Sequence, residues 1–600
     1  MTNNSVQRFN SMHLKRFHSR PYDLCMLILV IAASVFRIVL IHFNWPTTNS
    51  DEATIDLMAS HIAYRGEHPI FFYGQFYMGP LQAYLGALFF LLLGSSLFAL
   101  RLGMVLLFAL FLVSVYALTC TLYNQRLALV TIALLSLGSL DIILRELKAI
   151  GGYPETLLFG TLILLIASKL ALSAPAPGQT ISTSKRIRRF FAYGLLGLIE
   201  GLGIWSDQLI FPCLLTGGVI ILIFCHRDLR SWSVLALLLG CVIGAFPLLM
   251  YNTTAPIDQN SLDILLKLHS GSTDQHISFI SNIIGSFLVA LPTATGANPI
   301  LCSGSASSFG LTPSCIALQG GWTLGYCILW LVAAMSATGS LLRRWKYTRY
   351  RQTSLPAQPF PFMERQDTIR EFARLMLLFT AALTMFLYVT SSAPVFFPGP
   401  TARYLICMLI ATPALLWPLW PGFRRVYLLK HASVQSVDGE QANIEDVHKQ
   451  LDRRTKVTTI IRLNCLLLIA ATFLMGTIRV IADVPDAQTY YENQNALVHR
   501  LLGIGATRIY SDYWTCNRLI FQSNEQIICS TLNERLRPDF DRYQPYHDIV
   551  KAASAPMYVF PADSPKPATV EHMARKRNIP YRRYTFAGYD VYKVARHIKP

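Results

Sequence analysis

Residues 24–43 have the sequence LCMLILVIAASVFRIVLIHF, a run of mostly apolar residues that one charge, Arg37, interrupts. A helix of about 20 apolar residues is long enough to cross the hydrocarbon core of a bilayer. The basic residues Lys15, Arg16 and Arg20 precede this run, and no small-residue cleavage site follows it. The pattern therefore predicts a retained transmembrane helix and not a signal peptide that is removed.

The composition extends this prediction to most of the chain. Of the 600 residues, 53% are hydrophobic and only 14% are charged, whereas soluble domains contain about 25% charged residues. We expect an α-helical polytopic membrane protein with about 11–13 spans. The residues from Pro80 to Gly94 leave the count open, because they form either a partial or interfacial helix or part of a split span. Candidate spans cover residues 24–43, 80–94, 101–121, 127–144, 155–173, 190–205, 209–225, 232–251, 321–342, 375–391, 403–420 and 460–482.

The basic residues are unevenly distributed between the polar segments. Residues 185–189, 343–351 and 424–430 are rich in Lys and Arg, whereas residues 252–320 contain no Arg and a single Lys, Lys267. Cytoplasmic loops of membrane proteins carry the excess of Lys and Arg. The pattern thus predicts a cell-membrane protein with a cytoplasmic N-terminus (residues 1–23) and exterior loops at 44–79 and 252–320. The net charge of +18 then reflects topology and does not indicate a nucleic-acid partner.

The last part of the chain, residues 484–600, has the composition of a soluble domain. Short β-prone stretches, separated by helical or turn-like segments, predict a small α/β extracytoplasmic C-terminal domain that follows the membrane domain of residues 24–483. Two cysteine pairs, Cys302 with Cys315 and Cys516 with Cys529, lie in predicted exterior segments and could form disulfides in an oxidising compartment. Free thiols are the alternative. The β-prone stretches are Arg508–Tyr510, Gln526–Cys529, Met557–Phe560 and Tyr589–Val594.

Two adjacent carboxylates, Asp51 and Glu52, follow the first span directly. An acidic side chain at this position can bind a divalent cation or remove a proton from a hydroxyl group. It can equally be the favoured N-terminal turn of a helix, here a short helix over Glu52–Tyr64 with Ser50 or Asp51 as its cap. The residues alone leave both interpretations open.

Further charged residues lie near other predicted exterior ends of spans. Arg145 and Lys148 go against the charge bias of exterior segments, so we consider them for phosphate binding, with snorkelling at the interface as the alternative. Asp207 and Arg403 lie at two other turns, where an ionisable group near the membrane is a functional candidate.

The order of these features resembles the GT-C superfamily of membrane glycosyltransferases, which includes protein mannosyltransferases and the aminoarabinose transferases of lipid A. Ser50-Asp51-Glu52 matches the acidic motif of the first exterior loop, and Gly79-Pro80-Leu81 matches the start of the next helix. Residues 72–77, FYGQFY, match a motif of the bacterial branch and contain Tyr73, Gln75 and Tyr77. The resemblance spans nearly the whole chain. It also implies a second acid at Glu155 and an Arg-Tyr pair at Arg403 and Tyr404.

The resemblance implies glycosyl transfer from a polyprenyl-phosphate sugar to an acceptor hydroxyl at the extracytoplasmic face. Asp51, Glu52 and Glu155 are the catalytic candidates, and Asp51 would act as a general base or through Mg²⁺ or Mn²⁺ bound by Asp51 and Glu155. The sequence names neither the sugar nor the acceptor, which could be a protein, a lipid or a glycan. A transporter or lipid flippase and an inactive scaffold are the alternatives. The substrate-binding candidates are Tyr73, Gln75, Tyr77, Arg145, Lys148, Asp207, Arg403 and Tyr404.

Overall fold

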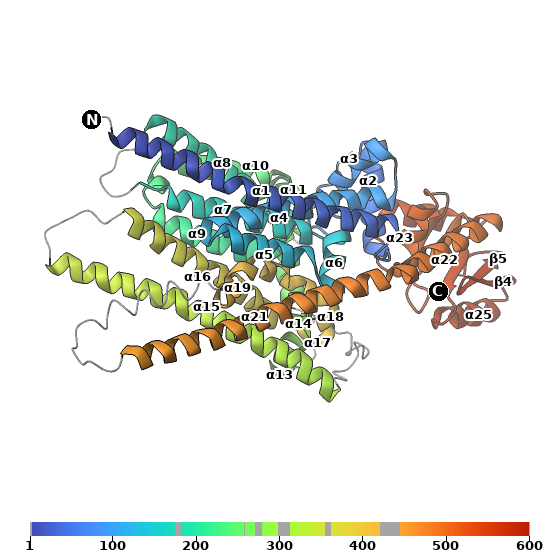
Figure 1. The fold of residues 1–600 in the computed structure, drawn as a ribbon. Coiled ribbons are helices and arrows are strands. Elements are labelled where there is room, and N and C mark those ends of the chain that lie inside the picture. Colours follow the sequence, from blue (N-terminus) through green and yellow to red (C-terminus); the bar gives the residue numbers. More distant parts are fainter. Residues whose placement is uncertain are drawn as a thin grey trace.

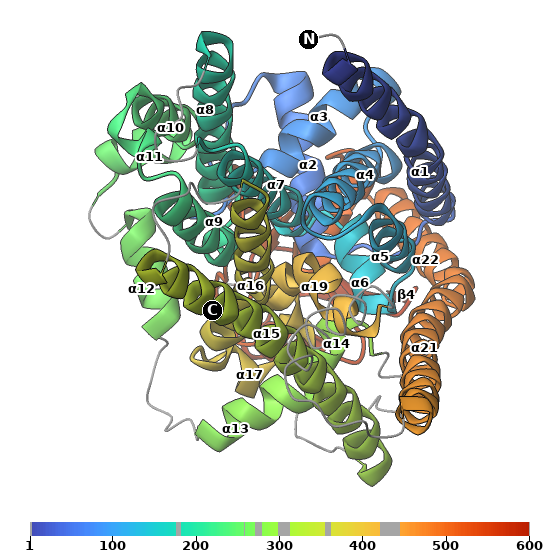
Figure 2. The same cartoon turned by 60° about the vertical axis from the view of Figure 1, so that its left-hand side comes forward.

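The computed structural model describes residues 3–175, 182–256, 259–270, 279–297, 312–354, 362–420 and 444–598. It is an elongated bundle of helices with a small α/β domain at one end (Figure 1). The long helix α1 (Asn3–His42) runs along the outside of the bundle, and α21 (Ile444–Ala482) runs along the outside toward the C-terminal domain. Figure 2 shows both helices at the periphery, with α7 (Tyr153–Leu172) and α16 (Phe362–Val389) nearer to the centre.

Seven helices of the described residues are long and apolar enough to cross a membrane, or up to nine if each of two bent helix pairs forms one span. The bent pairs are α5 (Gln125–Ser136) with α6 (Leu140–Leu147), at 88°, and α10 (Trp232–Gly244) with α11 (Phe246–Thr254), at 67°. This confirms the polytopic α-helical fold. The expected count of 11–13 is reached only if shorter apolar helices also cross. One of them is α3 (Leu81–Leu93), which at roughly 20 Å is shorter than the roughly 30 Å hydrocarbon core.

The remaining helices of the membrane domain follow in sequence order. They are α2 (Ser50–Arg65), α4 (Leu97–Leu122), α8 (Thr183–Ser206), η1 (Gln208–Ile210), α9 (Phe211–Phe224), η2 (Asp228–Arg230), α12 (Ser261–Ser270), α13 (Phe279–Ile284), η4 (Gly285–Ala290), α14 (Leu291–Thr295), α15 (Pro313–Ser354), α17 (Ala393–Phe396), α18 (Pro398–Thr401), η5 (Ala402–Ala411), α19 (Thr412–Leu416) and η6 (Trp417–Leu419).

The charge within the first span is paired inside the bundle. Arg37 is fully buried and forms an ion pair with Glu146 of α6, and its guanidinium lies 3.6 Å from the centre of the Phe108 ring. Charged groups at membrane depth require such partners, because hydrocarbon offers none. The α1 side chains Leu24, Ile28 and Ile31 are exposed, as expected for a surface that faces lipid.

The helix that follows the first span, α2, begins at Ser50, two residues before the start that its sequence predicts. Asn49, and neither Ser50 nor Asp51, is the N-cap, and its side-chain oxygen accepts a hydrogen bond from the Glu52 backbone N–H at 3.1 Å. Asn is among the preferred N-cap residues because its short side chain reaches the free N–H groups of the first turn. The helix ends at Arg65, and the residue that caps it, Gly66, has a φ of +68°, which glycine readily adopts. The cap places Asp51 and Glu52 in the first turn.

The C-terminal domain contains a five-stranded mixed sheet in the order β2-β1-β3-β5-β4. Strands β1 to β3 are parallel, and β5 is antiparallel to both β3 and β4. Each of the four predicted β-prone stretches overlaps a strand, whereas β4 is not predicted. The elements are α22 (Val484–Gly503), β1 (Arg508–Ser511), α23 (Tyr513–Gln522), β2 (Ile528–Thr531), α24 (Gln544–Ala552), β3 (Met557–Pro561), α25 (Lys566–Lys576), β4 (Tyr581–Phe586) and β5 (Tyr589–Val594).

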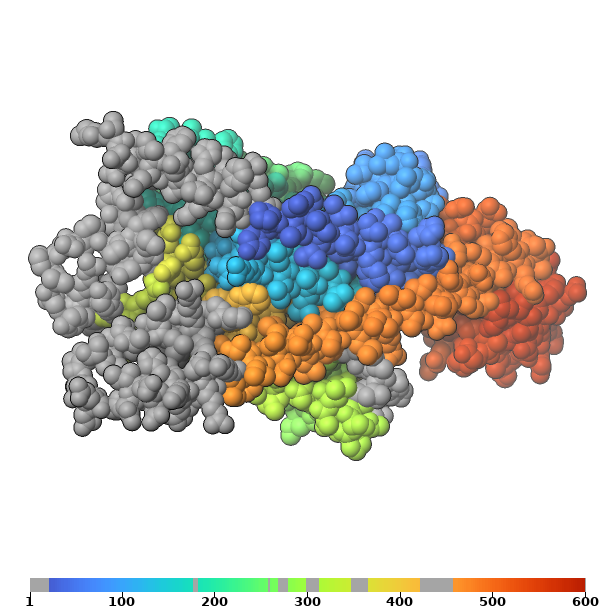
Figure 3. All heavy atoms as spheres, viewed as in Figure 1, coloured from blue at the N-terminus to red at the C-terminus, as the bar shows by residue number. Residues whose placement is uncertain are grey.

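A disulfide between Cys516 and Cys529 joins α23 to β2, which confirms one of the two predicted pairs. Cys302, of the other pair, lies outside the described residues. The domain covers one end of the bundle, next to the segment that holds α2 and α3 (Figure 3). Helix α23 packs on α2, where the Asn517 amide donates to Ser50 Oγ at 3.1 Å and to Thr54 Oγ1 at 2.9 Å.

Candidate active site

Asp51 lies where the membrane domain and the C-terminal domain meet. Its Oδ1 atom accepts a hydrogen bond from the Tyr513 hydroxyl and another from Arg542 Nη2, the latter at 2.8 Å. Arg542 Nε also donates to the Tyr513 hydroxyl at 2.7 Å, so the three side chains form a closed triangle. All three are largely shielded from solvent, yet both hydrogen bonds to the Asp51 carboxylate fall on Oδ1, which leaves Oδ2 without a partner among the described residues.

Glu52, the second acid of the pair, lies inside the bundle. It is fully buried, and Arg101 of α4 donates to both of its oxygens, at 2.9 and 2.7 Å. The Ala149 backbone N–H donates to the same carboxylate at 3.3 Å. One turn further along α2, Asp56 is also fully buried, and neither of its oxygens has a hydrogen-bond partner in the described part of the chain. Burial raises the pKa of Asp56 well above its usual range, and the nearby charge of Glu52 adds to this shift.

Arg403 is surrounded by aromatic side chains. Its guanidinium carbon lies 5.8 Å from the Tyr153 ring centre and 5.4 Å from that of Tyr404, and its Nε is buried with no hydrogen-bond partner among the described residues. The charge of Arg403 also interacts with the Asp51 carboxylate. The predicted Arg-Tyr pair therefore lies on the same side of the bundle as Asp51.

Tyr77 interacts with both Arg403 and Arg542. Burial raises the pKa of Tyr77 to about 12; Tyr404 and Asp207 add to the shift, while Arg542 and Arg403 oppose it. Tyr77 therefore interacts electrostatically with both guanidinium groups. The structure thus brings Asp51, Tyr77, Arg403 and Tyr404 together.

Asp207 and Glu155 form a deeper part of the same region. Asp207 packs against Gly152, where an added Cβ would lie 2.6 Å from that of Asp207. Burial raises the pKa of Asp207 to about 6, although backbone hydrogen bonds and the Arg403 charge oppose the shift. Glu155 is buried at the start of α7; its Oε2 accepts from Gln82 Nε2 at 2.9 Å, and its Oε1 has no partner among the described residues. Charge interactions link Glu155 to Asp207 and Asp207 to Arg403.

The two basic residues of the second cluster are already engaged by protein groups. Arg145 Nη2 donates to Asp141 Oδ1 at 2.8 Å and to the Pro400 carbonyl at 3.2 Å. Lys148 Nζ donates to the Thr47 carbonyl at 2.7 Å. Burial lowers the pKa of Lys148 to about 8, and the Glu52 charge opposes this shift. Both side chains are buried, and they connect α6 to the segments that hold Asp51 and Arg403.

Two residues of the aromatic motif lie differently from Tyr77. The Tyr73 hydroxyl donates to Glu67 Oε2 at 2.5 Å and lies 3.0 Å from Nδ1 of His61. His61 is fully buried, and its Nε2 lies 3.0 Å from the hydroxyl of Tyr546 in α24. Tyr73 thus belongs to a contact between α2 and the C-terminal domain. Gln75 is partly exposed, and its side chain forms no hydrogen bond with another described residue.

Comparison with solved structures identifies the architecture. The model superposes on ArnT from Cupriavidus metallidurans bound to undecaprenyl phosphate with a TM-score of 0.52 at 13% sequence identity, covering 94% of this chain and 97% of that one. The chain has the GT-C fold. The apo form of the same enzyme superposes with a TM-score of 0.49 at 14% identity, covering 95% of this chain and 98% of that one. The archaeal oligosaccharyltransferase AglB from Archaeoglobus fulgidus superposes with a TM-score of 0.41 at 13% identity, covering 95% of this chain and 74% of that one. No protein-family model and no curated protein sequence matches the chain.

Within this GT-C bundle, the donor set for a divalent cation is small. The described residues contain no group of three or more His, Cys, Asp or Glu side chains that could hold a metal ion. Asp51 Oδ2 and Glu155 Oε1 are carboxylate oxygens without a protein partner there. Mg²⁺ is often bound by one or two carboxylates and several waters. These two oxygens are donors of the right kind, and the binding of Mg²⁺ or Mn²⁺ stays a prediction.

Sequence reasoning did not find Tyr513 and Arg542. They lie more than 460 residues after Asp51 in the chain, in a domain whose docking on α2 no local pattern predicts. No local sequence signal singles out either residue, because both act through contacts between domains that are distant in the chain.

Proposed function

We propose that this protein is a membrane glycosyltransferase that moves a sugar from a polyprenyl-phosphate donor to an acceptor hydroxyl. The observation that supports this most is the geometry of Asp51. Tyr513 and Arg542 fix one carboxylate oxygen, and the other oxygen is left to receive a proton. The GT-C fold agrees with the proposal, since the ArnT structure with this architecture is bound to undecaprenyl phosphate.

In the proposed reaction, the acceptor oxygen attacks the anomeric carbon while its proton passes to Asp51 Oδ2. The bond between the anomeric carbon and the phosphate oxygen breaks, and its electron pair leaves with polyprenyl phosphate. A phosphate is a stable anion, so the reaction needs no dedicated general acid. Attack on the side opposite to the leaving group inverts the anomeric configuration, as the family resemblance implies.

Arg403 is the group that we assign to the donor phosphate. It has a buried N–H without a partner in the described residues, and Arg matches the geometry of phosphate oxygens. The rings of Tyr404 and Tyr153 lie beside the guanidinium and shield it from water, which strengthens its attraction to the charge that develops on the leaving group. Asp207 balances this charge when no donor is bound.

An apolar cavity of about 490 Å³ offers a place for the polyprenyl chain. It lies between η4, α15, α16 and η5. Tyr404 packs against the same apolar cluster as Met408, which lines the cavity, and five residues of 3₁₀ helix separate Arg403 from Met408 by about 10 Å. An isoprenoid chain could therefore run from the phosphate at Arg403 into this cavity. Its lining includes Phe287, Tyr326, Trp330, Met385 and Met408.

Other predicted site residues receive positioning roles in this proposal. Glu52, bound by Arg101, fixes the first turn of α2 and so places Asp51. Arg145 and Lys148 tie the chain segments on either side of the site together. Glu155 holds Gln82. If a divalent cation binds, Asp51 and Glu155 would hold it, and the cation would supply charge stabilisation for the leaving phosphate.

We place the reaction at the extracytoplasmic face. In Figure 1 the basic ends of α8 and α15 lie at the end of the bundle opposite to α2 and the C-terminal domain, and basic segments favour the cytoplasm. The test is transfer of radiolabelled sugar by the purified chain from a panel of polyprenyl-phosphate donors. Transfer from at least one donor is expected. Absence of transfer from every donor and acceptor class would contradict the proposal and favour a transporter.

A further inference from the structure

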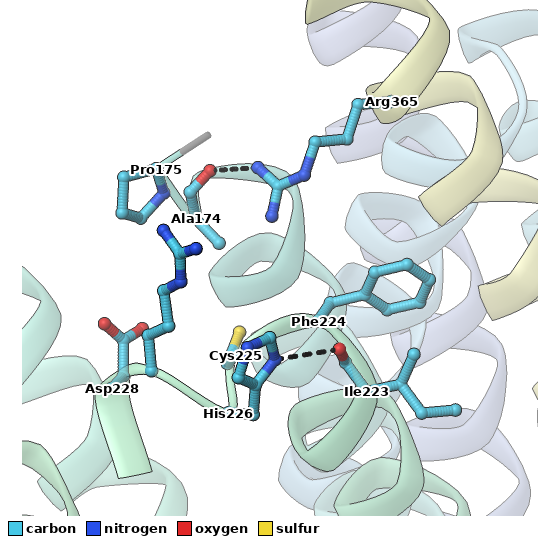
Figure 4. A pocket seen from close by; sticks show the side chains of 9 residues that line it. Ala174, Pro175, Ile223, Phe224, Cys225, His226, Asp228 and Arg365 are labelled. Atoms are coloured by element: carbon cyan, nitrogen blue, oxygen red, sulfur yellow. Dashed lines mark hydrogen bonds between the residues drawn. The ribbon is translucent and has the colours of Figure 1, made fainter. Parts of the chain in front are cut away.

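A second pocket lies at the end of the bundle opposite to Asp51. It has a volume of about 210 Å³, well above the roughly 10–15 Å³ that one water molecule needs. Its walls are the C-terminal ends of α7 and α9, the turn that follows α9, and the first turns of α16 (Figure 4). Its charged lining residues are Arg227, Asp228 and Arg365.

The pocket carries more positive charge than its own carboxylate can balance. Asp228 is its one acid in the described residues, and this carboxylate already accepts from Arg189 and from the Tyr193 hydroxyl, the latter at 3.0 Å. Arg227 and Arg365 have no acidic partner in the described parts of the chain. The charge of Arg365 is instead opposed by the charges of Arg189 and Arg227. Bringing like charges together in this way is unfavourable unless an anion lies between them.

Helix capping accounts for only part of this cluster. Arg365 donates through Nη1 to the Ala174 carbonyl at the end of α7, and Arg189 donates to the Leu170 carbonyl at 2.9 Å. Both bonds satisfy free carbonyls at a helix C-terminus. An arginine has five N–H donors, however, so Arg365 retains most of its own. Arg227 is exposed, and its side chain forms no hydrogen bond or ion pair with another residue in the described part of the chain.

The surroundings favour an anion that also has an apolar part. Arg365 is the first residue of a candidate membrane span, which places the pocket at the depth of the lipid headgroups. Ile223 lines the pocket and is 49% exposed, and the neighbouring Leu222 is 61% exposed. Basic pockets between helices at a membrane surface bind the phosphate of anionic lipid headgroups. We propose that this pocket binds a phosphate group, through Arg227 and Arg365, as a site separate from the proposed donor site.

The test uses the purified full-length chain in neutral detergent, with thermal unfolding as the readout of binding. The probes are phosphatidylglycerol, phosphatidylcholine with the same acyl chains, and inorganic phosphate. The variant is Arg227→Gln, which changes an exposed side chain. Its matched control is Arg230→Gln, which removes the same charge three residues away from an exposed position outside the pocket lining.

We expect saturable stabilisation by phosphatidylglycerol that is about tenfold weaker in Arg227→Gln and unchanged in Arg230→Gln, because one charge-assisted interaction with phosphate is lost. The same variant pattern with inorganic phosphate alone would support the site and assign it to a soluble phosphate compound. Equal stabilisation of both variants by every probe, or equal effects of phosphatidylglycerol and phosphatidylcholine, would overturn the proposal. So would the absence of stabilisation by any probe.

Discussion

Arg542 Nη2 donates to Asp51 Oδ1 at 2.8 Å across a separation of 491 residues. The bond joins the first turn of α2 in the membrane domain to the C-terminal domain, and Tyr513 closes the triangle from α23. Under the proposed function, the C-terminal domain is therefore part of the active site, because it orients the carboxylate that accepts the proton.

Replacing Arg542 tests this role. Arg542→Ala should lower the rate constant of sugar transfer by roughly 10- to 100-fold, because a misplaced general base loses much of its effect. The measurement is kcat for transfer at saturating donor. Arg535→Ala, an exposed arginine of the same segment, serves as the control and should leave kcat unchanged. An equal loss in both variants would show that the effect is not specific to Asp51.

Glu52 and Asp51 should respond differently to the loss of charge. Glu52→Gln leaves Arg101 buried without its partner, and breaking a buried ion pair costs about 3–5 kcal/mol. We expect a large decrease in the free energy of unfolding, measured by denaturation in detergent, and partial recovery of stability in the double variant Glu52→Gln/Arg101→Met. A fully stable but inactive Glu52→Gln variant would instead assign Glu52 a direct catalytic role.

Arg403 should affect the donor specifically. Arg403→Gln removes a charge-assisted interaction with phosphate worth about 1.5–3 kcal/mol, so kcat/KM for the donor should fall by roughly 10- to 150-fold. KM for the acceptor should change little. Arg403→Lys keeps the charge and should recover part of the activity. A selective increase in the acceptor KM would place Arg403 on the acceptor side.

The pKa of Asp207, raised by burial to about 6, predicts a pH dependence. Between about pH 4 and 6 the folded chain binds more protons at this group than the unfolded chain does, so its contribution to stability decreases as the pH rises through that window. Activity should show the opposite trend, because ionised Asp207 helps to orient the Arg403 guanidinium toward the donor phosphate: kcat/KM should decrease below about pH 6. This acidic limb should disappear in Asp207→Asn, and its persistence there would assign it to another group.

The sequence predicts the membrane helices well because their signal is local. About 20 consecutive apolar residues determine a span, and the β-prone stretches of the tail determine four of the five strands. The missed strand, β4, has charged residues in its sequence, YRRYTF, and a mostly exposed burial pattern, so hydrophobicity does not reveal it. The span count stays ambiguous because bends such as that between α5 and α6 divide one apolar run into two helices.

The candidate site could be predicted only in part, for a different reason. Acids next to a span indicate Asp51 and Glu52 as a pair, but their different environments depend on Arg101, Tyr513 and Arg542. These partners come from α4 and from the C-terminal domain, and no sequence spacing encodes such tertiary contacts. The interpretation of Arg145 and Lys148 as phosphate ligands likewise could not anticipate the backbone carbonyls that they bind.

The most direct test of the proposed function is the rate of sugar transfer by Asp51→Asn from the donor that the wild-type chain accepts. A general base contributes roughly 100- to 10,000-fold, so the rate should fall within that range. The rate is measured at a temperature where both proteins are folded, because losing the ion pair with the largely buried Arg542 also lowers stability. The control is Asp548→Asn, which removes an exposed carboxylate elsewhere in the C-terminal domain. This variant should transfer sugar at the wild-type rate. Unchanged transfer by Asp51→Asn would contradict the role proposed for this carboxylate.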